Sequence, residues 1–258
     1  MSHQLVQCPN CDLVYADNPP DESVLAHAYH ISEFDSQQEA DDAAATYIRA
    51  VRPMLKNVPN KKSALEIGTG TGIFLEYLHS EGFDTVEGVE PSAAAIAAAP
   101  AHRRQWIREG IFKKADFEPA SFDFICCFMT LEHVRDPKEI AAAASSLLRP
   151  GGIVAFVTHD YRSSINRLLG KRSPIIDIEH MQLFSRHSIS QLLERNGFGN
   201  IQIGNFRNCY ALHYWVRLLP INLRSKNILI GILNHIGLID LKLSFNVGNI
   251  ISFGYLVK

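Results

Sequence analysis

Three glycines alternate with threonines directly after a short apolar run, in the stretch SALEIGTGTGIF (residues 63–74). One carboxylate, Glu66, precedes Gly68, Gly70 and Gly72. Glycine permits positive φ and lets the backbone approach a ligand without an intervening Cβ. A strand, a tight glycine turn and a helix N-terminus in this order predict a site for a nucleotide-like ligand.

Two phosphate-binding motifs fit this stretch poorly. A dinucleotide fold requires G-x-G-x-x-G/A, and counting from Gly68 places Ile73 where the last small residue should be. The third glycine, Gly72, comes one position early. A P-loop needs Gly-Lys-Ser/Thr after the turn, and none follows. The spacing therefore argues against both phosphate sites.

Two carboxylates point to a cationic ligand that carries a ribose. Glu66 ends the first expected strand, where a carboxylate would repel a pyrophosphate and attract an amine or sulfonium. Glu90 ends the second expected strand and suits a carboxylate that accepts both hydroxyls of an adenosine ribose. S-Adenosylmethionine combines a ribose with an adjacent positive group and has no phosphate. We therefore expect it as the cofactor.

Methyl transfer needs alignment, exclusion of water and, for a protic acceptor, a base. Glu132 and His133 follow the expected fourth strand, and His159 and Asp160 follow the fifth. Adjacent strand ends can present all four to one cavity, and histidine is the natural base near neutral pH. A structural role for His133, holding its loop by hydrogen bonds, is the alternative.

These residues require parallel strands that end at one edge. Short apolar runs alternate with helical patterns, which predicts a doubly wound α/β sheet. We expect strands at 63–67, 84–90, 104–109, 122–129, 153–160, 200–206 and 249–258. Helices are expected at 72–82, 92–99, 136–148 and 185–198, with Ser92, Asp136 and Ser185 as N-caps.

Several of these motifs together resemble a known family. ALEIGTGTG, the acid in VEGVEPS, SFDFICCFMTLEHVRDP and LLRPGGIVAFVTHD resemble, in order, the motifs of class I S-adenosylmethionine-dependent methyltransferases over about residues 60–200. The likeness is strongest to the small-molecule branch with ubiquinone-type, sugar and natural-product methyltransferases. It implies a Rossmann-like sheet of seven strands with strand seven antiparallel, an N-terminal extension and a C-terminal helical insertion.

The resemblance also implies roles for individual residues. Glu66 would help to place the cofactor's amine, Phe112 would face the adenine or pack in the core, and Met129 would lie beneath the cofactor. The implied cofactor-binding set is Glu66, Gly68, Thr69, Gly70, Gly72, Glu90, Phe112 and Met129. The resemblance adds His180, which matches a histidine that often precedes a Phe-Ser helix start in this family. The candidate catalytic set is His180, His159, His133 and Glu132, with His180 or His159 expected as base or substrate anchor.

Metal sites have incomplete ligand sets. In ubiquinone-type enzymes a Glu-x-x-Glu-His segment is associated with a divalent metal, but Met129 stands where its first acid belongs, so we expect none there. Cys8 and Cys11 resemble half of a zinc module that commonly has two CxxC pairs, with His3 a poor third ligand. Zinc at these cysteines is left as an alternative.

The chain organisation follows from composition. We expect an N-terminal extension at 1–60, the cofactor-binding core at 61–210, a helical insertion at 211–246 and a last core strand at 247–258. The insertion is apolar and basic. A cap on the domain or on a second subunit, as in a homodimer, is favoured over contact of 217–243 with a membrane surface.

Net charge and targeting signals restrict the class of partner. The formal net charge is −2, which gives no general attraction to nucleic acid. No secretion signal or membrane-spanning run appears, which predicts a cytoplasmic protein. The expected function is S-adenosylmethionine-dependent methylation of a small metabolite, on an oxygen of a sugar, polyketide-like or lipid-linked acceptor. N-methylation, macromolecule methylation and a cofactor-binding partner without catalysis are the alternatives.

Overall fold

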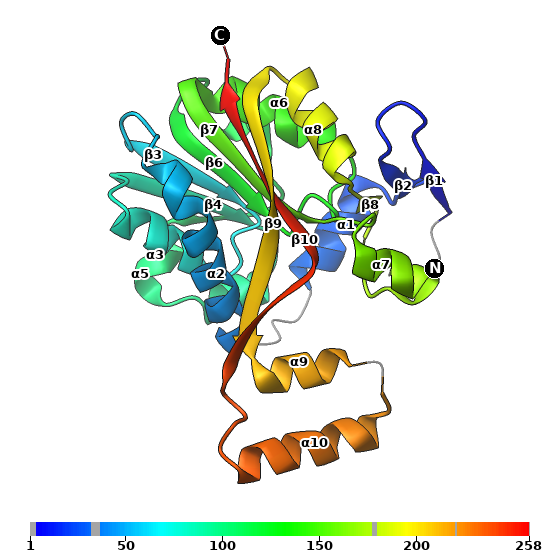
Figure 1. Ribbon diagram of the computed structural model, residues 1–258. Helices are drawn as coiled ribbons and strands as arrows, with labels where there is room; N and C mark the ends of the chain where they lie inside the picture. The colour runs from blue at the N-terminus through cyan, green and yellow to red at the C-terminus, as the bar shows by residue number, and fades with distance from the viewer. Residues whose placement is uncertain (1–3, 32–36, 177–179, 220, 258) are drawn as a thin grey trace.

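A computed structural model describes residues 4–31, 37–176, 180–219 and 221–257 of the chain. Its main sheet has the strand order β5-β4-β3-β6-β7-β10-β9, with helices on both faces (Figure 1). The strands are β3 (Ser63–Ile67), β4 (Thr85–Glu90), β5 (Ile107–Glu109), β6 (Phe122–Phe128), β7 (Leu148–His159), β9 (Phe198–Ala211) and β10 (Lys242–Leu256).

The sheet confirms the predicted seven strands and the antiparallel seventh. β3 to β7 pair in parallel, whereas β10, the last strand along the chain, is antiparallel to both β7 and β9. The continuous apolar run of β6 is buried at every residue, as expected for a central strand covered on both faces. The parallel strands therefore place their carboxyl ends at one edge.

Helices cover both faces. On one face α2 (Gln37–Leu55) and α3 (Ile73–Ser80) bury apolar side chains, and on the other α6 (Pro137–Leu147) and α8 (Arg186–Arg195) do so. The predicted N-caps are confirmed for α4 (Ala93–Ala98), α6 and α8, because the side chains of Ser92, Asp136 and Ser185 each accept a backbone N–H. The short helix α5 (Ala101–Arg104) packs against α3, and α7 (Ser164–Leu169) packs against β10.

Three strands are longer than their apolar runs predicted. β7 starts at Leu148 instead of residue 153, since Gly151 takes φ +79° and the register shifts, which lets the chain enter the sheet early. β9 and β10 continue past the sheet edge as a two-stranded ribbon whose pairing reaches Ala211 and Lys242. That ribbon carries α9 (Leu212–Leu218) and α10 (Leu223–His235) away from the core (Figure 1).

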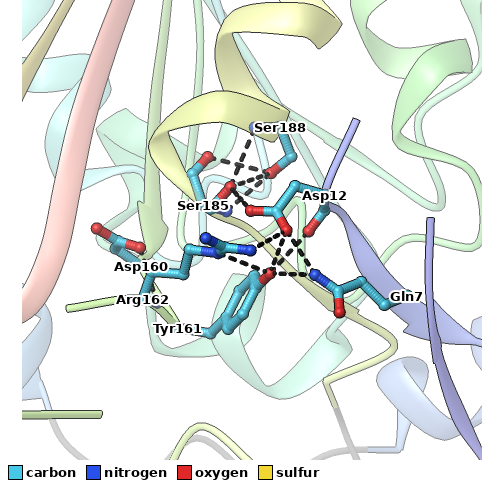
Figure 2. Close-up of polar contacts among 7 residues, drawn as sticks. All are labelled: Gln7, Asp12, Asp160, Tyr161, Arg162, Ser185 and Ser188. Carbon is cyan, nitrogen blue, oxygen red and sulfur yellow. Dashed lines mark hydrogen bonds and ion pairs between the residues drawn. The ribbon is translucent and has the colours of Figure 1, made fainter. Parts of the chain in front are cut away.

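The N-terminal segment docks on the core through polar contacts. β1 (Leu5–Gln7) and β2 (Val14–Ala16) form a hairpin that pairs with β8 (Gln182–Leu183), and α1 (Glu22–His30) follows. Figure 2 shows the Asp12 carboxylate where side chains from three segments meet. It accepts hydrogen bonds from Ser185, Tyr161 and Arg162. Burial opposes ionisation, but these bonds and one from Gln7 lower the pKa of Asp12.

The predicted domain limits remain predictions, although the packing of two segments bears on them. α2 belongs to the predicted extension, yet Ile48, Val51 and Leu55 lie in the main core. α10 has no buried residue and packs against α9. Within the described residues, no helix is both long enough and apolar enough to cross a membrane.

Candidate functional site

The glycine turn lies at the carboxyl ends of β3 and β4, and two of its glycines are required by close packing. Gly68, Gly70 and Gly72 take φ of +80°, +56° and +69°. A Cβ on Gly68 would lie 2.3 Å from Thr130 Oγ1, and one on Gly72 would lie 3.0 Å from Ile107 Cδ1. A Cβ on Gly70 would meet nothing within 4 Å, so the turn is open there.

Glu66 is a buried carboxyl group beside this turn. It is 4% exposed, and Thr69 Oγ1 donates a hydrogen bond of 2.5 Å to its Oε2. Burial raises the pKa of Glu66 to about 8, against the opposing hydrogen bond and with a further increase from the nearby Glu90. A cationic group beside Glu66 would relieve this cost, because an opposite charge favours the ionised form.

The Glu90 side chain links the glycine turn to the segment that follows β4. Gly70 N donates to its Oε2 at 2.7 Å, and Ser92 N donates to its Oε1 at 2.8 Å. Burial raises the pKa of Glu90, and the two backbone bonds act against that rise. Each carboxylate oxygen has a second lone pair for a ligand donor. The carboxylate therefore lies beside the open side of the glycine turn.

Met129 and Phe112 are two further predicted cofactor residues. Met129 directly follows β6 with φ +51°, and its N–H donates to Val157 O. A positive φ on a non-glycine residue is a form of strain that is common at functional sites. Phe112 stacks on Phe117, with centroids 5.8 Å apart. That contact fits the core alternative, and a contact of Phe112 with adenine stays a prediction.

These residues fit the predicted cofactor. The site offers a buried carboxyl group whose ionisation would be favoured by an amine, an open glycine backbone, and a second carboxylate with free acceptor capacity. Thr71 Oγ1 is also buried near the turn with no hydrogen-bond partner among the described residues. A ligand with an ammonium group and paired hydroxyls matches this donor and acceptor set.

Three predicted histidines gather at the same sheet edge. The His133 and His180 ring centroids are 4.7 Å apart, and those of His159 and His180 are 5.2 Å apart. His180 Nδ1 lies 3.1 Å from Ile175 O. Tyr29 of α1 packs edge-on to His133 and donates to its carbonyl at 3.1 Å. The structure thus brings together residues from four separate segments.

A side-chain relay orients His159. His159 Nδ1 lies 2.7 Å from Asn249 Oδ1, and Asn249 Nδ2 donates to Asn208 Oδ1 at 2.9 Å. The contact with Asn208 sets the amide orientation of Asn249, so its oxygen faces the imidazole. Since an amide oxygen only accepts, Nδ1 carries the proton and Nε2 of the neutral ring is the basic nitrogen.

Comparison with known proteins decides the family. The sequence model of the family described as "Methyltransferase domain" matches residues 36–203, well over half of the chain.

The chain belongs to this methyltransferase family.

Two curated relatives match parts of the chain. The chain is 35% identical to the "Ubiquinone biosynthesis O-methyltransferase" of Idiomarina loihiensis over 126 residues, which cover 46% of this chain and 49% of that protein. It is 31% identical to the protein of the same name from Ralstonia nicotianae over 156 residues, which cover 56% and 63% respectively. The match to the first relative thus spans about half of that protein's length.

Solved structures share the methyltransferase fold. A SAM-dependent methyltransferase from Archaeoglobus fulgidus superposes with a TM-score of 0.55 at 15% identity, covering 91% of this chain and 100% of that one. Phosphoethanolamine N-methyltransferase 2 of Haemonchus contortus, solved with S-adenosyl-L-methionine, gives 0.53 at 16% identity and covers 95% and 61%. At these identities the likeness concerns the fold alone.

Glu132 binds backbone N–H groups near the histidines. It is fully buried, and its Oε1 accepts from His159 N at 2.7 Å. Its carbonyl accepts from Met181 N at 2.8 Å, which ties the start of β8 to the loop after β6. Burial raises the pKa of Glu132 to about 7, against hydrogen bonds from backbone groups. Oε2 has no partner among the described residues.

Asp160 does not join the histidines, contrary to the prediction for the end of β7. Successive strand residues point to opposite faces, so Asp160 lies on the side away from His159. It accepts from Arg162 N at 2.9 Å and lines a polar cavity of about 650 Å³ with Arg186 and Ser185. The one-cavity expectation is therefore wrong for this residue.

Cys8 and Cys11 lie in one turn, and their thiol pKa values are shifted in opposite directions. Backbone N–H groups of Cys11 and Asn10 lower the pKa of Cys8, while burial raises that of Cys11. His3 lies outside the described residues. No group of three or more His, Cys, Asp or Glu with metal-binding geometry occurs in the part of the chain that the structure describes. Zinc at Cys8 and Cys11 stays an open alternative.

Sequence reasoning missed four residues of the site. A Cβ on Gly88 of β4 would lie 2.5 Å from Thr69 Cγ2, so this glycine makes room for the turn. Tyr29, Asn208 and Asn249 were not singled out. The sequence carried a signal for the two asparagines. Asparagine is unfavourable within an apolar strand, and a buried asparagine needs a hydrogen-bond partner.

Proposed function

We propose that this protein is an S-adenosylmethionine-dependent methyltransferase that methylates an oxygen of a small metabolite. The observation that carries the proposal is a single sheet edge with two different sites. One side holds the glycine turn between Glu66 and Glu90, and the other holds three clustered histidines. The first suits a cationic adenosine cofactor and the second suits removal of a proton from an acceptor.

Three groups would hold the cofactor. Glu66, once ionised, would accept hydrogen bonds from the amine, and the open backbone at Gly70 would line the same moiety. Glu90 would accept from the ribose hydroxyls while Gly70 N and Ser92 N hold it in place. When bound, S-adenosylmethionine supplies a methyl group on a sulfonium, which an oxygen nucleophile can attack directly.

His159 is our choice for the base. Asn249 holds the proton on Nδ1, so Nε2 can accept the hydroxyl proton of an acceptor. His180 adjoins His159, and His133 adjoins His180; both would anchor the acceptor or share the proton. Glu132 binds the backbone of His159 and fixes its distance from the loop after β6. No metal is required for this sequence of steps.

The acceptor class is a hydroxyl-bearing metabolite. The curated relatives are named for O-methylation in ubiquinone biosynthesis, which supports an oxygen acceptor. We retain sugar, polyketide-like and lipid-linked acceptors as the set to be tested. The three histidines favour a weakly acidic hydroxyl, because a base near neutral pH deprotonates such a group most readily.

The test separates cofactor binding from turnover. Calorimetry with S-adenosylhomocysteine should show binding that Glu90→Ala weakens by about 10- to 100-fold, the size of loss expected for one or two charge-assisted hydrogen bonds. Product formation is then measured with panels of phenols, sugars and lipid-linked hydroxyl compounds. His159→Ala should bind S-adenosylhomocysteine normally and lose turnover.

Three outcomes would contradict the proposal. Absence of S-adenosylhomocysteine binding by the wild type would remove the cofactor assignment. Turnover with amines, RNA or protein in place of hydroxyl compounds would establish the N-directed or macromolecular alternative. Tight binding with no product from any panel or from a metabolite extract would support a non-catalytic cofactor-binding partner.

A further inference from the structure

The helical hairpin formed by α9 and α10 exposes a concentrated apolar surface. Eleven of the seventeen large apolar side chains exposed among the described residues lie between residues 218 and 245. They are Leu218, Leu219, Ile221, Leu223, Ile228, Leu229, Ile232, Ile236, Leu238, Leu241 and Phe245. Soluble monomers rarely gather this much apolar surface in one place without an interaction that covers it.

α10 has little packing of its own beyond an N-cap, in which the Asn222 side chain accepts from Ser225 N. None of its residues is buried, and its main packing partner is α9, at the end of a two-stranded ribbon. A helix of this length is marginal in water, and in proteins most helical stability comes from packing of an apolar face. The hairpin therefore needs a covering surface.

The apolar surface of α10 forms a stripe. Ile228, Ile232 and Ile236 recur every four residues and are 52–55% exposed, so they lie on one side of the helix. Asn227 and Asn234 fall on the other side by the same geometry. Ile230 and Leu233 are half-buried, as expected for the side that meets α9.

The charges of the hairpin point away from an anionic membrane as the cover. A membrane-surface helix normally carries a polar face rich in free Lys and Arg. Here Arg217 pairs with Glu39 at 2.8 Å and Lys242 with Asp42 at 2.5 Å. Lys226 Nζ donates to Arg217 O. These three cations are engaged by α2 or by the hairpin backbone. Arg224 is exposed one turn before Ile228 on the same side of α10, so one cation borders the three uncharged isoleucines.

We propose that the isoleucine stripe of α10 is the interface of a homodimer, in which two hairpins pack across a twofold axis. An uncharged apolar stripe is complementary to itself, and a twofold axis brings the same patch of both chains together. The two hairpins then form a four-helix arrangement with the stripes inside. A stable interface buries about 800 Å² on each partner, so the interface must include exposed apolar side chains of the hairpin beyond the three isoleucines.

The test is the oligomeric state of the full chain. Sedimentation velocity at micromolar concentration should give twice the 28.8 kDa chain mass for the wild type. The double variant Ile232→Glu and Ile236→Glu should sediment as a monomer, with the dimer dissociation constant raised at least about 100-fold by burial of unpaired charges. Its melting temperature and its affinity for S-adenosylhomocysteine report whether the fold is kept.

A matched control places the same charges on the other side of α10. Asn227→Glu with Asn234→Glu should stay dimeric. A monomeric wild type, a dimeric stripe variant, or equal dissociation of both variants would overturn the proposal. A monomeric wild type that floats with phosphatidylglycerol vesicles would assign the stripe to a lipid surface. The sedimentation measurement requires no methyl acceptor, so a failure of the proposed activity would not contradict the proposed dimer.

Discussion

The cofactor side and the acceptor side of the sheet edge are built in different ways. The cofactor side comes from two short segments, the turn from Glu66 to Gly72 and the end of β4 with Glu90 and Ser92. The acceptor side takes His133, His159, His180, Asn249 and Tyr29 from widely separated elements. The first is a local motif with its own backbone hydrogen bonds, while the second exists only when β6, β7, β10 and α1 are in place.

This difference predicts how each side fails when it is altered. A change in the glycine turn strains the backbone at the centre of the sheet, so stability and cofactor binding should fall together. A change in the acceptor side removes one side chain from a preformed scaffold, so turnover should fall alone. The following predictions run from the largest expected effect to the smallest.

The largest effect is expected from Gly68→Ala. Its φ of +80° is unfavourable for alanine, and the new Cβ would overlap Thr130. Strain and overpacking together should lower the free energy of unfolding by about 2–5 kcal/mol, measured by urea denaturation. Gly82→Ala is the control, since φ is +96° there but nothing lies within 4 Å of the added Cβ. Equal losses in both variants would show that packing against Thr130 is unimportant.

The second prediction distinguishes the proposed base, His159, from Asn249, which positions it, by their effects on kcat. His159→Ala should lower kcat by about 10²- to 10⁴-fold with cofactor affinity unchanged. Asn249→Leu should also depress kcat, because the imidazole loses its Nδ1 partner. Asn249→Asp should restore activity and move the acid limb of the kcat profile to higher pH, since a carboxylate favours the protonated ring. An unmoved profile would contradict the relay.

The third effect is a pH dependence on the cofactor side. The pKa of Glu66 is raised by burial from 4.5 to about 8, so the free protein carries it protonated at neutral pH. An amine ligand favours the ionised form, and affinity for S-adenosylhomocysteine should rise with pH, by up to about tenfold per unit, until about pH 8. Glu66→Gln should remove the slope. Affinity that falls with pH in the wild type would reverse the assignment.

The raised pKa of Glu66 should also make the ligand-free protein less stable as pH rises, whereas cofactor affinity increases. Because the folded state holds the Glu66 proton above pH 4.5 and the unfolded chain does not, the contribution to stability is full below pH 4.5 and is lost as pH rises toward 8. Glu132, with a pKa of about 7, acts in the same direction. Urea denaturation of the ligand-free protein between pH 5 and 8 should show this decline, and Glu66→Gln should reduce it to the part that Glu132 contributes.

The smallest effect is expected at the N-cap of α6, which belongs to neither the cofactor side nor the acceptor side. Asp136→Ala removes the side chain that accepts from Lys138 N at 2.8 Å at the start of α6. Stability should fall by about 1 kcal/mol with no change in kcat. Asp136→Asn should preserve it, because asparagine caps equally well. A loss of turnover on Asp136→Ala would mean that the two sides are less independent than the packing indicates.

The cofactor side was readable from the sequence because its physics is local. Positive φ at Gly68, the run of β6 and the N-caps of α4 and α6 depend on residues close in the chain. The antiparallel last strand followed from the family resemblance. Strand ends were less predictable, since β9 and β10 extend each other by pairing beyond the sheet, which neither strand encodes alone.

The tertiary structure alone decided which side chains meet. The sequence by itself determined the parallel sheet, the glycine turn with its two acids, and the set of histidines available for chemistry. It did not show that Asn249 orients His159, that Asp160 points away, or that the isoleucine stripe of α10 is left uncovered. Those outcomes depend on contacts between residues tens of positions apart, and short-range patterns carry no information about such pairs.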